Sequence, residues 1–177
     1  MLSVDLRTSM LVVIDMQSRL IPAIDGAASI VANTRRLVDA AALLGAPALF
    51  TEQNPKGLGA TVAELAPDPS IVVPKMTFDA SRSPEFLLRA PGDRAVVIVG
   101  CEAHVCVLQT ALGLIDRGRR VFVVRDAIGS RRAESKEAAI ARMARHDVEI
   151  VTTEMVVFEW LGTAEHPRFR EAAALIR

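Results

Sequence analysis

The chain has 177 residues and carries 21 Lys and Arg against 21 Asp and Glu, so its formal net charge is zero. With 51% hydrophobic and 24% charged residues, it has the composition of a globular protein with a sizeable core, which excludes disorder and fibrous repeats. We expect one domain over residues 1–177. A balanced charge offers no electrostatic footprint for a polyanion, so we expect a small-molecule partner and neither nucleic acid nor a membrane surface.

Cysteine content and the first residues indicate the compartment. The two cysteines, Cys101 and Cys106, are too few and too close together for the disulfide framework of a secreted protein. The first ten residues lack the basic segment and long apolar run of a signal peptide. No apolar run approaches the roughly 18 to 20 residues that a membrane helix needs. We therefore expect a cytoplasmic protein.

Six short apolar runs rich in β-branched residues are the first elements that the sequence predicts. They cover residues 10–15, 46–51, 70–75, 95–100, 120–126 and 148–153. These runs do not alternate with polar residues, and such near-continuous apolar runs are typical of strands covered on both faces in a parallel sheet.

Segments with helical periodicity lie between several of the runs. The predicted helices cover residues 27–44, the segment that follows Cys106 as far as Ile115, residues 134–146 and residues 167–176. In the first helix Ile30, Leu37 and Ala41 fall on one apolar stripe, and Gly45 ends it. Strands that alternate with helices predict right-handed crossovers and a three-layer α/β/α sandwich.

The connection over residues 52–68, EQNPKGLGATVAELAPD, is long for a compact domain. Connections of this length are usually functional or mobile. The alternative is a surface excursion with a short helix at residues 61–65. The sequence leaves both interpretations open, including whether this stretch acts as a lid.

Polar side chains follow the predicted strands, where parallel sheets bind their ligands. These residues are Asp15 and Gln17, Glu52 and Gln53, Lys75, Glu102 and Asp126, with Cys106 opening the helix after the fourth strand. Because the carboxyl ends of parallel strands meet at one edge, we expect a carboxylate, an amine and a thiol to converge there.

Cys106 is the natural centre of this group. A helix N-terminus and a nearby Lys75 ammonium both favour the thiolate, so we expect a lowered pKa for the thiol, with Asp15 accepting the proton as substrate arrives. Each residue also has a structural reading: a free cysteine is usually a small buried hydrophobe, Asp15 a turn or cap residue, and Lys75 a surface lysine. Their joint placement at strand ends favours the site, and Cys101 is interpreted as core packing.

Other site templates fit poorly. A receiver domain needs an acidic pair at the first strand, and Asp15 is followed by Met16. No phosphate-binding GxxxxGK[ST] or GxGxxG motif follows a strand. His104, His146 and His166 lack metal-ligand spacing, so we expect neither a metal nor a cofactor.

Three blocks of the sequence point to a family. LVVIDMQ carries Asp15, VVPKMTFDAS carries Lys75, and VIVGCEAHVCVLQTALGLIDRGRRVFVVRDAIGSR carries Cys106. Together they resemble the isochorismatase-like cysteine hydrolases, a family that includes nicotinamidases, over nearly the whole chain. TEQNPKGLGATVAEL further resembles the isochorismatase-domain-containing subgroup.

The resemblance implies a fold and a reaction. The fold is a Rossmann-like six-stranded parallel sheet between helices. The triad is Asp15 as base, Lys75 as orienting cation and Cys106 as nucleophile. A non-proline cis peptide falls at Cys101–Glu102, and the backbone N–H groups of Glu102 and Cys106 form the oxyanion hole. Thiolate attack on an amide-like carbonyl then gives a thioester that water hydrolyses.

Departures from the family pattern narrow the substrate. Nicotinamidases carry an Asp-x-His and a further histidine that bind a metal, and this chain has no such histidines after Lys75 or around Glu52. We therefore do not expect nicotinamide. Glu102 predicts a more acidic pocket that favours a substrate with a hydrogen-bond donor or positive charge. The predicted lining residues are Gln17, Gln53, Phe78 and His104.

Two functions from different classes follow. The first is a metal-independent cysteine hydrolase of C–N bonds in a small molecule. The alternative is a catalytically silent binding or redox-sensing module on the same fold. The apolar residues of the segment 156–161 either pack on the sheet or form an interface, and we expect a homo-oligomer, a dimer or higher.

Overall fold

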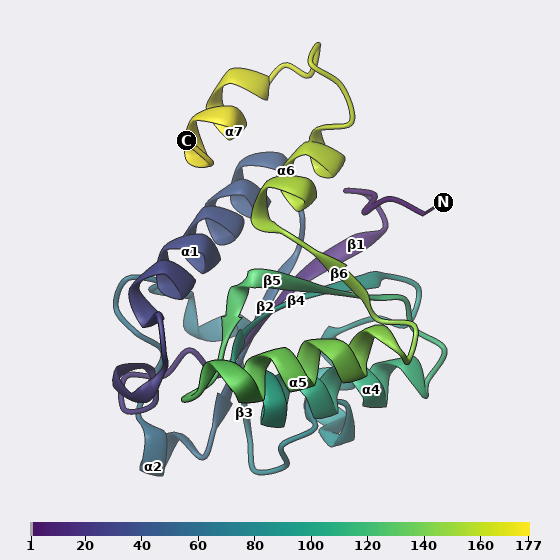
Figure 1. The fold of residues 1–177 in the computed structure, drawn as a ribbon. Coiled ribbons are helices and arrows are strands. Elements are labelled where there is room, and N and C mark those ends of the chain that lie inside the picture. The colour runs from purple at the N-terminus through teal and green to yellow at the C-terminus, as the bar shows by residue number, and fades with distance from the viewer. Residues whose placement is uncertain (1) are drawn as a thin grey trace.

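The computed structural model describes residues 2–177 and is built around a six-stranded sheet in the order β3–β2–β1–β4–β5–β6. Every strand pair in it is parallel. The strands are β1 (Ser9–Ile14), β2 (Ala48–Gln53), β3 (Val72–Lys75), β4 (Ala95–Cys101), β5 (Val121–Gly129) and β6 (Glu149–Val151). Helices cover both faces (Figure 1), so the predicted three-layer α/β/α sandwich is confirmed.

The helices divide between the two faces. The helices are α1 (Ala27–Leu44), α2 (Pro55–Leu58), α3 (Pro84–Arg89), α4 (Leu108–Ile115), α5 (Ala133–Ala144), α6 (Thr153–Leu161) and α7 (Phe169–Leu175). Helices α1, α6 and α7 pack on one face, and α4 and α5 pack on the other (Figure 1). Helix α3 joins the second group through the buried Phe86. Short 3₁₀ turns lie at Ile21–Ala23, Pro69–Ile71 and Ala80–Arg82, and a π-helical turn at Ala103–Val107.

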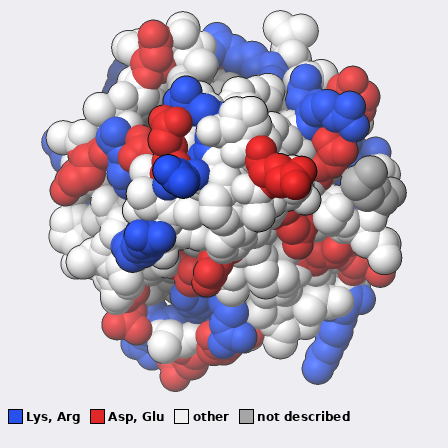
Figure 2. Space-filling view, turned by 90° about the horizontal axis from the view of Figure 1, so that it is seen from above, with Lys and Arg blue, Asp and Glu red and all other residues white. Residues whose placement is uncertain are grey.

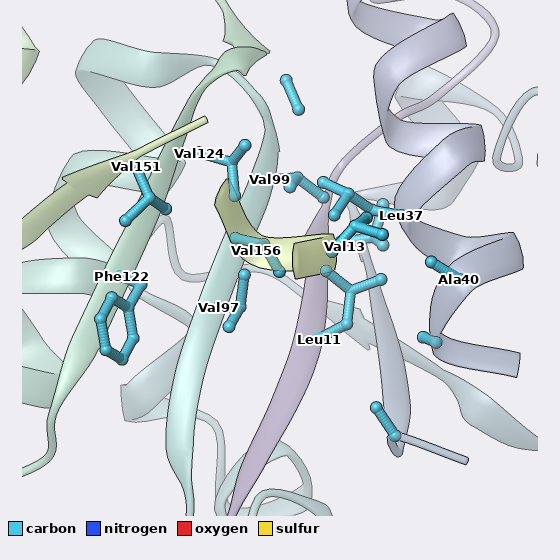
Figure 3. Packing of buried hydrophobic residues seen from close by; sticks show 14 of the residues in the cluster. Leu11, Val13, Leu37, Ala40, Val97, Val99, Phe122, Val124, Val151 and Val156 are labelled. Atoms are coloured by element: carbon cyan, nitrogen blue, oxygen red, sulfur yellow. The ribbon is translucent and has the colours of Figure 1, made fainter. Parts of the chain in front are cut away.

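The strand sequences are almost continuously apolar because the strands are buried on both faces. Every residue of β1 is buried. Leu11 and Val13 point to the core under α1, while Met10, Val12 and Ile14 join the core under α4 and α5. Figure 3 shows the first of these cores, where β1, β4 and β5 face α1 and α6. A strand with a helical layer on each side has no solvent face, which explains the missing polar alternation.

Several predicted boundaries differ from the structure. The helix expected at residues 61–65 is wrong: the helical turn of this connection is α2, and Thr61 instead forms an isolated bridge with Gln17. The strand expected at residues 148–153 ends at Val151, because the Thr152 side chain accepts a hydrogen bond from the Met155 N–H and caps α6.

The apolar segment 156–161 packs within the chain. Val156, Val157, Trp160 and Leu161 are buried in the core under α1, and the Trp160 indole donates a hydrogen bond of 3.0 Å to the Ser9 hydroxyl. Phe158 is 40% exposed. The expected homo-oligomer stays a prediction.

The surface carries charges of both signs. On the face seen in Figure 2, positive and negative side chains are interspersed over the white apolar and polar surface. No helix within residues 2–177 has the length and apolar character to cross a membrane.

The sheet reverses its winding between β1 and β4. These neighbours form the topological switch point at which open α/β sheets place their ligands. Gly100, near the end of β4, has a φ of +114°, and a Cβ there would lie 2.0 Å from the Ile14 carbonyl oxygen. Only glycine allows β4 to approach β1 this closely, so this residue shapes the crevice beyond the two strand ends.

Candidate active site

A cavity of about 340 Å³ lies beyond the carboxyl ends of β1, β2 and β4. Its polar lining is Asp15, Gln53, Glu102, Cys106 and Arg131. Its apolar lining is Leu20, Ala23, Leu58, Phe78 and Val105. The position at the switch point is the one that parallel-sheet geometry predicts for a small-molecule site.

Asp15 is the first residue after β1. Its φ is +49°, in the left-handed region that aspartate tolerates better than most residues. Its backbone N–H donates to the Thr51 carbonyl at 3.1 Å, and the Thr51 hydroxyl donates to Oδ1 at 2.6 Å. The residue is fully buried. Neighbouring β2 therefore fixes both the backbone and the carboxylate of Asp15.

Lys75 is the last residue of β3, two strands from β1. Its Nζ lies 2.7 Å from Asp15 Oδ2, and both side chains are 0% exposed. Nζ also donates to Gln53 Oε1 at 2.8 Å, and the Gln53 amide donates to the Met76 carbonyl. The structure thus brings together the carboxylate and the amine that the sequence predicts at separate strand ends, in a buried ion pair whose two members each make a further hydrogen bond.

Cys106 lies in the π-helical turn between β4 and α4 and lines the cavity with Asp15. Burial, followed by the negative charge of Asp15, raises the pKa of the Cys106 thiol to about 12, against an opposing effect of Lys75. The predicted lowering of this pKa is therefore wrong, because desolvation and the carboxylate outweigh the ammonium. At neutral pH the resting group is a thiol, and it needs a base to become a nucleophile.

Two of the four predicted lining residues occupy the cavity wall. Gln53 and Phe78 line it, and Phe78 is 51% exposed. His104 instead makes a hydrogen bond of 2.9 Å to Ser130 Oγ and lines a neighbouring hollow. Gln17 is fully buried away from the cavity.

Gln17 holds the connection that follows β2. Its amide donates to the carbonyls of Gly59 and Gln53 at 2.6 and 3.0 Å, and its Oε1 accepts from the Gln53 N–H at 2.8 Å. Glu52 Oε1 accepts from both the N–H and the hydroxyl of Thr61 at 2.7 and 2.8 Å. The first part of the connection is thus tied to the sheet, and it forms the cavity wall that includes Leu58.

The acidic pocket that Glu102 predicts from the sequence is not found in the structure. The Glu102 Oε1 accepts a hydrogen bond of 2.8 Å from Arg131 Nε, so an ion pair neutralises the carboxylate. Sequence reasoning missed Arg131, although its place directly after the DAIGS motif was a signal. The Cys101–Glu102 peptide bond before this side chain is cis, as the resemblance implies.

Metal ligation finds no support in the side chains that the structure describes. Within residues 2–177 no group of three or more His, Cys, Asp or Glu side chains could hold a metal ion.

Comparison with known proteins gives consistent matches. The isochorismatase domain model matches residues 9–155. Isochorismatase domain-containing protein 1 of Danio rerio is 41% identical over 96% of this chain, which spans only 61% of that protein. Isochorismatase domain-containing protein 2 of Xenopus laevis is 37% identical over 96% of this chain and 84% of that protein. A solved Caenorhabditis elegans structure described as MAR1 ribonuclease is 35% identical, with a TM-score of 0.90 over 98% of this chain and 92% of that one.

Proposed function

The chain belongs to the isochorismatase family, and from that premise we propose that it is a hydrolase that cleaves an amide-type C–N bond of a small molecule. The reaction proceeds through a thioester on Cys106. One observation carries this proposal: Asp15 and Cys106 line the same cavity, and Lys75 lies 2.7 Å from the Asp15 carboxylate. A thiol and a base in one cavity, with a cation paired to the base, support nucleophilic catalysis.

In the first step the Cys106 sulfur attacks the substrate carbonyl carbon while its proton passes to Asp15. The proton transfer is required because the resting thiol has a pKa raised to about 12. Negative charge leaves Asp15 and appears on the carbonyl oxygen, so the net charge of the site is unchanged. The Lys75 ammonium, no longer paired with a carboxylate, then acts on the new oxyanion through its charge from behind Asp15, because its buried side chain does not line the cavity.

The oxyanion is assigned to the backbone N–H groups of Glu102 and Cys106. Both residues line the cavity: Glu102 directly precedes the turn between β4 and α4, and Cys106 lies within that turn. Backbone donors fixed before the reaction need no reorganisation as charge develops, which is why such arrangements lower the barrier.

In the second step protonated Asp15 returns its proton to the departing nitrogen, and ammonia or an amine leaves the thioester. Asp15 then takes a proton from water as the water oxygen attacks the thioester carbonyl. Collapse of this intermediate expels the sulfur, which recovers the proton from Asp15. The sum is one amide and one water converted to one carboxylic acid and one amine.

The binding or redox-sensing alternative draws less support from the thiol. Redox-sensing cysteines combine a low pKa with solvent access, whereas burial raises the pKa of Cys106 to about 12 and leaves the residue 6% exposed.

Recognition of RNA, suggested by the description of the Caenorhabditis elegans relative, is also less favoured. A cavity of about 340 Å³ in a chain of zero net charge suits a small molecule better than a polyanion.

The test is to trap the thioester. The protein is incubated with a panel of small primary amides, quenched in acid and measured by intact mass, with ammonia release followed in parallel. We expect an acyl adduct on the peptide that contains Cys106, and hydroxylamine should remove it. Ammonia release without that adduct, or an adduct on Cys101, would overturn the proposal.

A further inference from the structure

The charged side chains that line the cavity all have partners within the protein. Asp15 is paired with Lys75 at 2.7 Å, and Glu102 is paired with Arg131 at 2.8 Å. The remaining lining is Gln53, Cys106 and five apolar side chains. An incoming charged group would therefore meet no free counter-ion among these lining residues, and it would lose its hydration on entry.

The two ion pairs differ in how readily they can open. Asp15 and Lys75 are both 0% exposed, so this pair is closed to exchange. In the other pair the Arg131 side chain is 61% exposed, while Glu102 is only 12% exposed. Arg131 can swing into water at small cost, but Glu102 cannot follow it. Of the two ion pairs at this cavity, the Glu102–Arg131 pair is thus the one that can open.

This asymmetry predicts different costs for the two signs of charge. An anion that captures Arg131 leaves the largely buried Glu102 carboxylate without its partner, which is expensive. A cation that takes the place of Arg131 keeps Glu102 paired and releases Arg131 to solvent. The cation still competes with an ion pair that is already formed, so it gains less than it would from a free carboxylate.

We propose that the Glu102–Arg131 pair is a charge filter, which selects neutral small molecules and rejects anions more strongly than cations. The proposal rests on the proposed function in one respect: it names the substrate class of that site as neutral amides. Arg131 acts here as a specificity-determining residue that the reaction steps do not use.

The test measures access to Cys106 and needs no turnover. In a Cys101→Ala background, Cys106 is labelled with three methanethiosulfonates that carry a propyl, a 2-aminoethyl or a 2-sulfonatoethyl group. Each reagent forms a mixed disulfide with the thiol and releases methanesulfinic acid. Rates are followed by intact mass and divided by the rate of the same reagent with 2-mercaptoethanol. The ratio between reagents on one thiol cancels changes in the pKa of that thiol.

In the parent we expect the normalised rates to fall in the order propyl, aminoethyl, sulfonatoethyl, with the last at least about tenfold below the first. Glu102→Gln frees Arg131 and should raise sulfonatoethyl relative to propyl by about tenfold. Arg131→Gln frees Glu102 and should lift aminoethyl above propyl. Both changes should shrink in high salt.

The matched control is Arg132→Gln, because Arg132 lines the neighbouring hollow and not this cavity, and its 78% exposed side chain pairs with Glu134. This variant removes the same charge beside the same loop and should leave the three ratios unchanged. If Glu102→Gln does not fold, the Arg131→Gln result decides alone, since the Arg131 side chain is largely exposed.

Three results would overturn the charge filter. They are equal normalised rates for the three reagents in the parent, an Arg132→Gln effect as large as that of Arg131→Gln, and failure of the propyl reagent to reach Cys106. The proposed function fails separately, by absence of the acyl-enzyme, because labelling by these reagents requires only an accessible thiol.

Discussion

Cys101 and Cys106 are five residues apart and carry the same raised pKa of about 12, yet they occupy opposite sides of the sheet. Cys101 lies at the end of β4 in the core under α1, with its sulfur 3.8 Å from the Met16 sulfur. Cys106 lies on the other face, where the core opens into the cavity. The resting pKa therefore does not distinguish a nucleophile from a packing residue.

The difference lies in what surrounds each thiol after burial is counted. Burial is the largest cause of both raised pKa values. For Cys101 the next cause is Glu102, while for Cys106 it is Asp15, with Lys75 acting in the opposite direction. Only Cys106 has a paired base and cation beside it and a cavity in front of it. Access and a proton acceptor make the candidate nucleophile.

The largest expected effect comes from removal of the candidate nucleophile. Cys106→Ala should lower kcat on any amide that the protein hydrolyses by at least about 10³-fold, because no other group forms the thioester. Steady-state ammonia release measures this effect, and far-UV circular dichroism checks the fold. If Cys106→Ala kept a kcat within tenfold of the parent, Cys106 would not be the nucleophile, and the functional difference between the two cysteines would be lost.

The second prediction removes the cation that pairs with Asp15 and opposes the raised pKa of Cys106. Lys75→Met leaves the Asp15 carboxylate buried with the Thr51 hydroxyl but without its counter-ion, and it should lower the free energy of unfolding by about 3 to 5 kcal/mol. Urea denaturation at neutral pH measures the loss.

The double variant Asp15→Asn with Lys75→Met is the matched control for that loss. Removal of both charges leaves no unpaired ion, so the double variant should be markedly more stable than Lys75→Met alone. Equal losses in the single and double variants would mean that Lys75 contributes packing and little charge compensation.

The third prediction concerns the rate at which the two thiols are alkylated at different pH, with an expected effect of about tenfold. Only the thiolate reacts with iodoacetamide, and the pKa of Cys106 is raised to about 12. The labelling rate should therefore climb about tenfold per pH unit from pH 7 to pH 10 without a plateau. Asp15→Asn removes a negative charge that raises this pKa, so it should speed labelling at pH 8 by about tenfold.

Cys101 provides the internal reference in the same experiment. It is 0% exposed and should stay unlabelled while the protein is folded, which peptide mapping of the alkylated protein can check. A plateau near pH 8 for Cys106 would contradict the raised pKa and return the thiol to the lowered value expected from the sequence.

The convergence of the site was predictable because it depends on sheet geometry. Asp15 and Lys75 follow apolar runs, and the ends of parallel strands share one edge, so their meeting required only the assignment of β1 and β3. Burial of each strand on both faces was equally predictable, because each strand is a nearly continuous apolar run.

The electrostatic environment was not predictable, because it depends on tertiary contacts between distant residues. Arg131 is 29 residues from Glu102 and reaches it only after β5 has returned beside β4. The desolvation that raises the pKa of Cys106 comes from packing around the turn, which composition does not reveal. The end of the last strand was predicted at residue 153 for a local reason, because Thr152, which caps α6, continues the run rich in β-branched residues that begins at Val148.

The smallest expected effect is that of replacing Cys101, the cysteine in the core under α1. Cys101→Ala removes one buried sulfur from the core under α1 and should lower the free energy of unfolding by about 1 to 2 kcal/mol, through lost packing and a small cavity. Its kcat should stay within about twofold of the parent, because the thiol neither lines the cavity nor contacts Asp15 or Lys75 by a hydrogen bond. Urea denaturation and ammonia release on one preparation measure both quantities. Cys106→Ala should give the opposite pattern, a large kinetic loss with little change in stability, and the contrast fails if Cys101→Ala slows turnover while unfolding is unchanged.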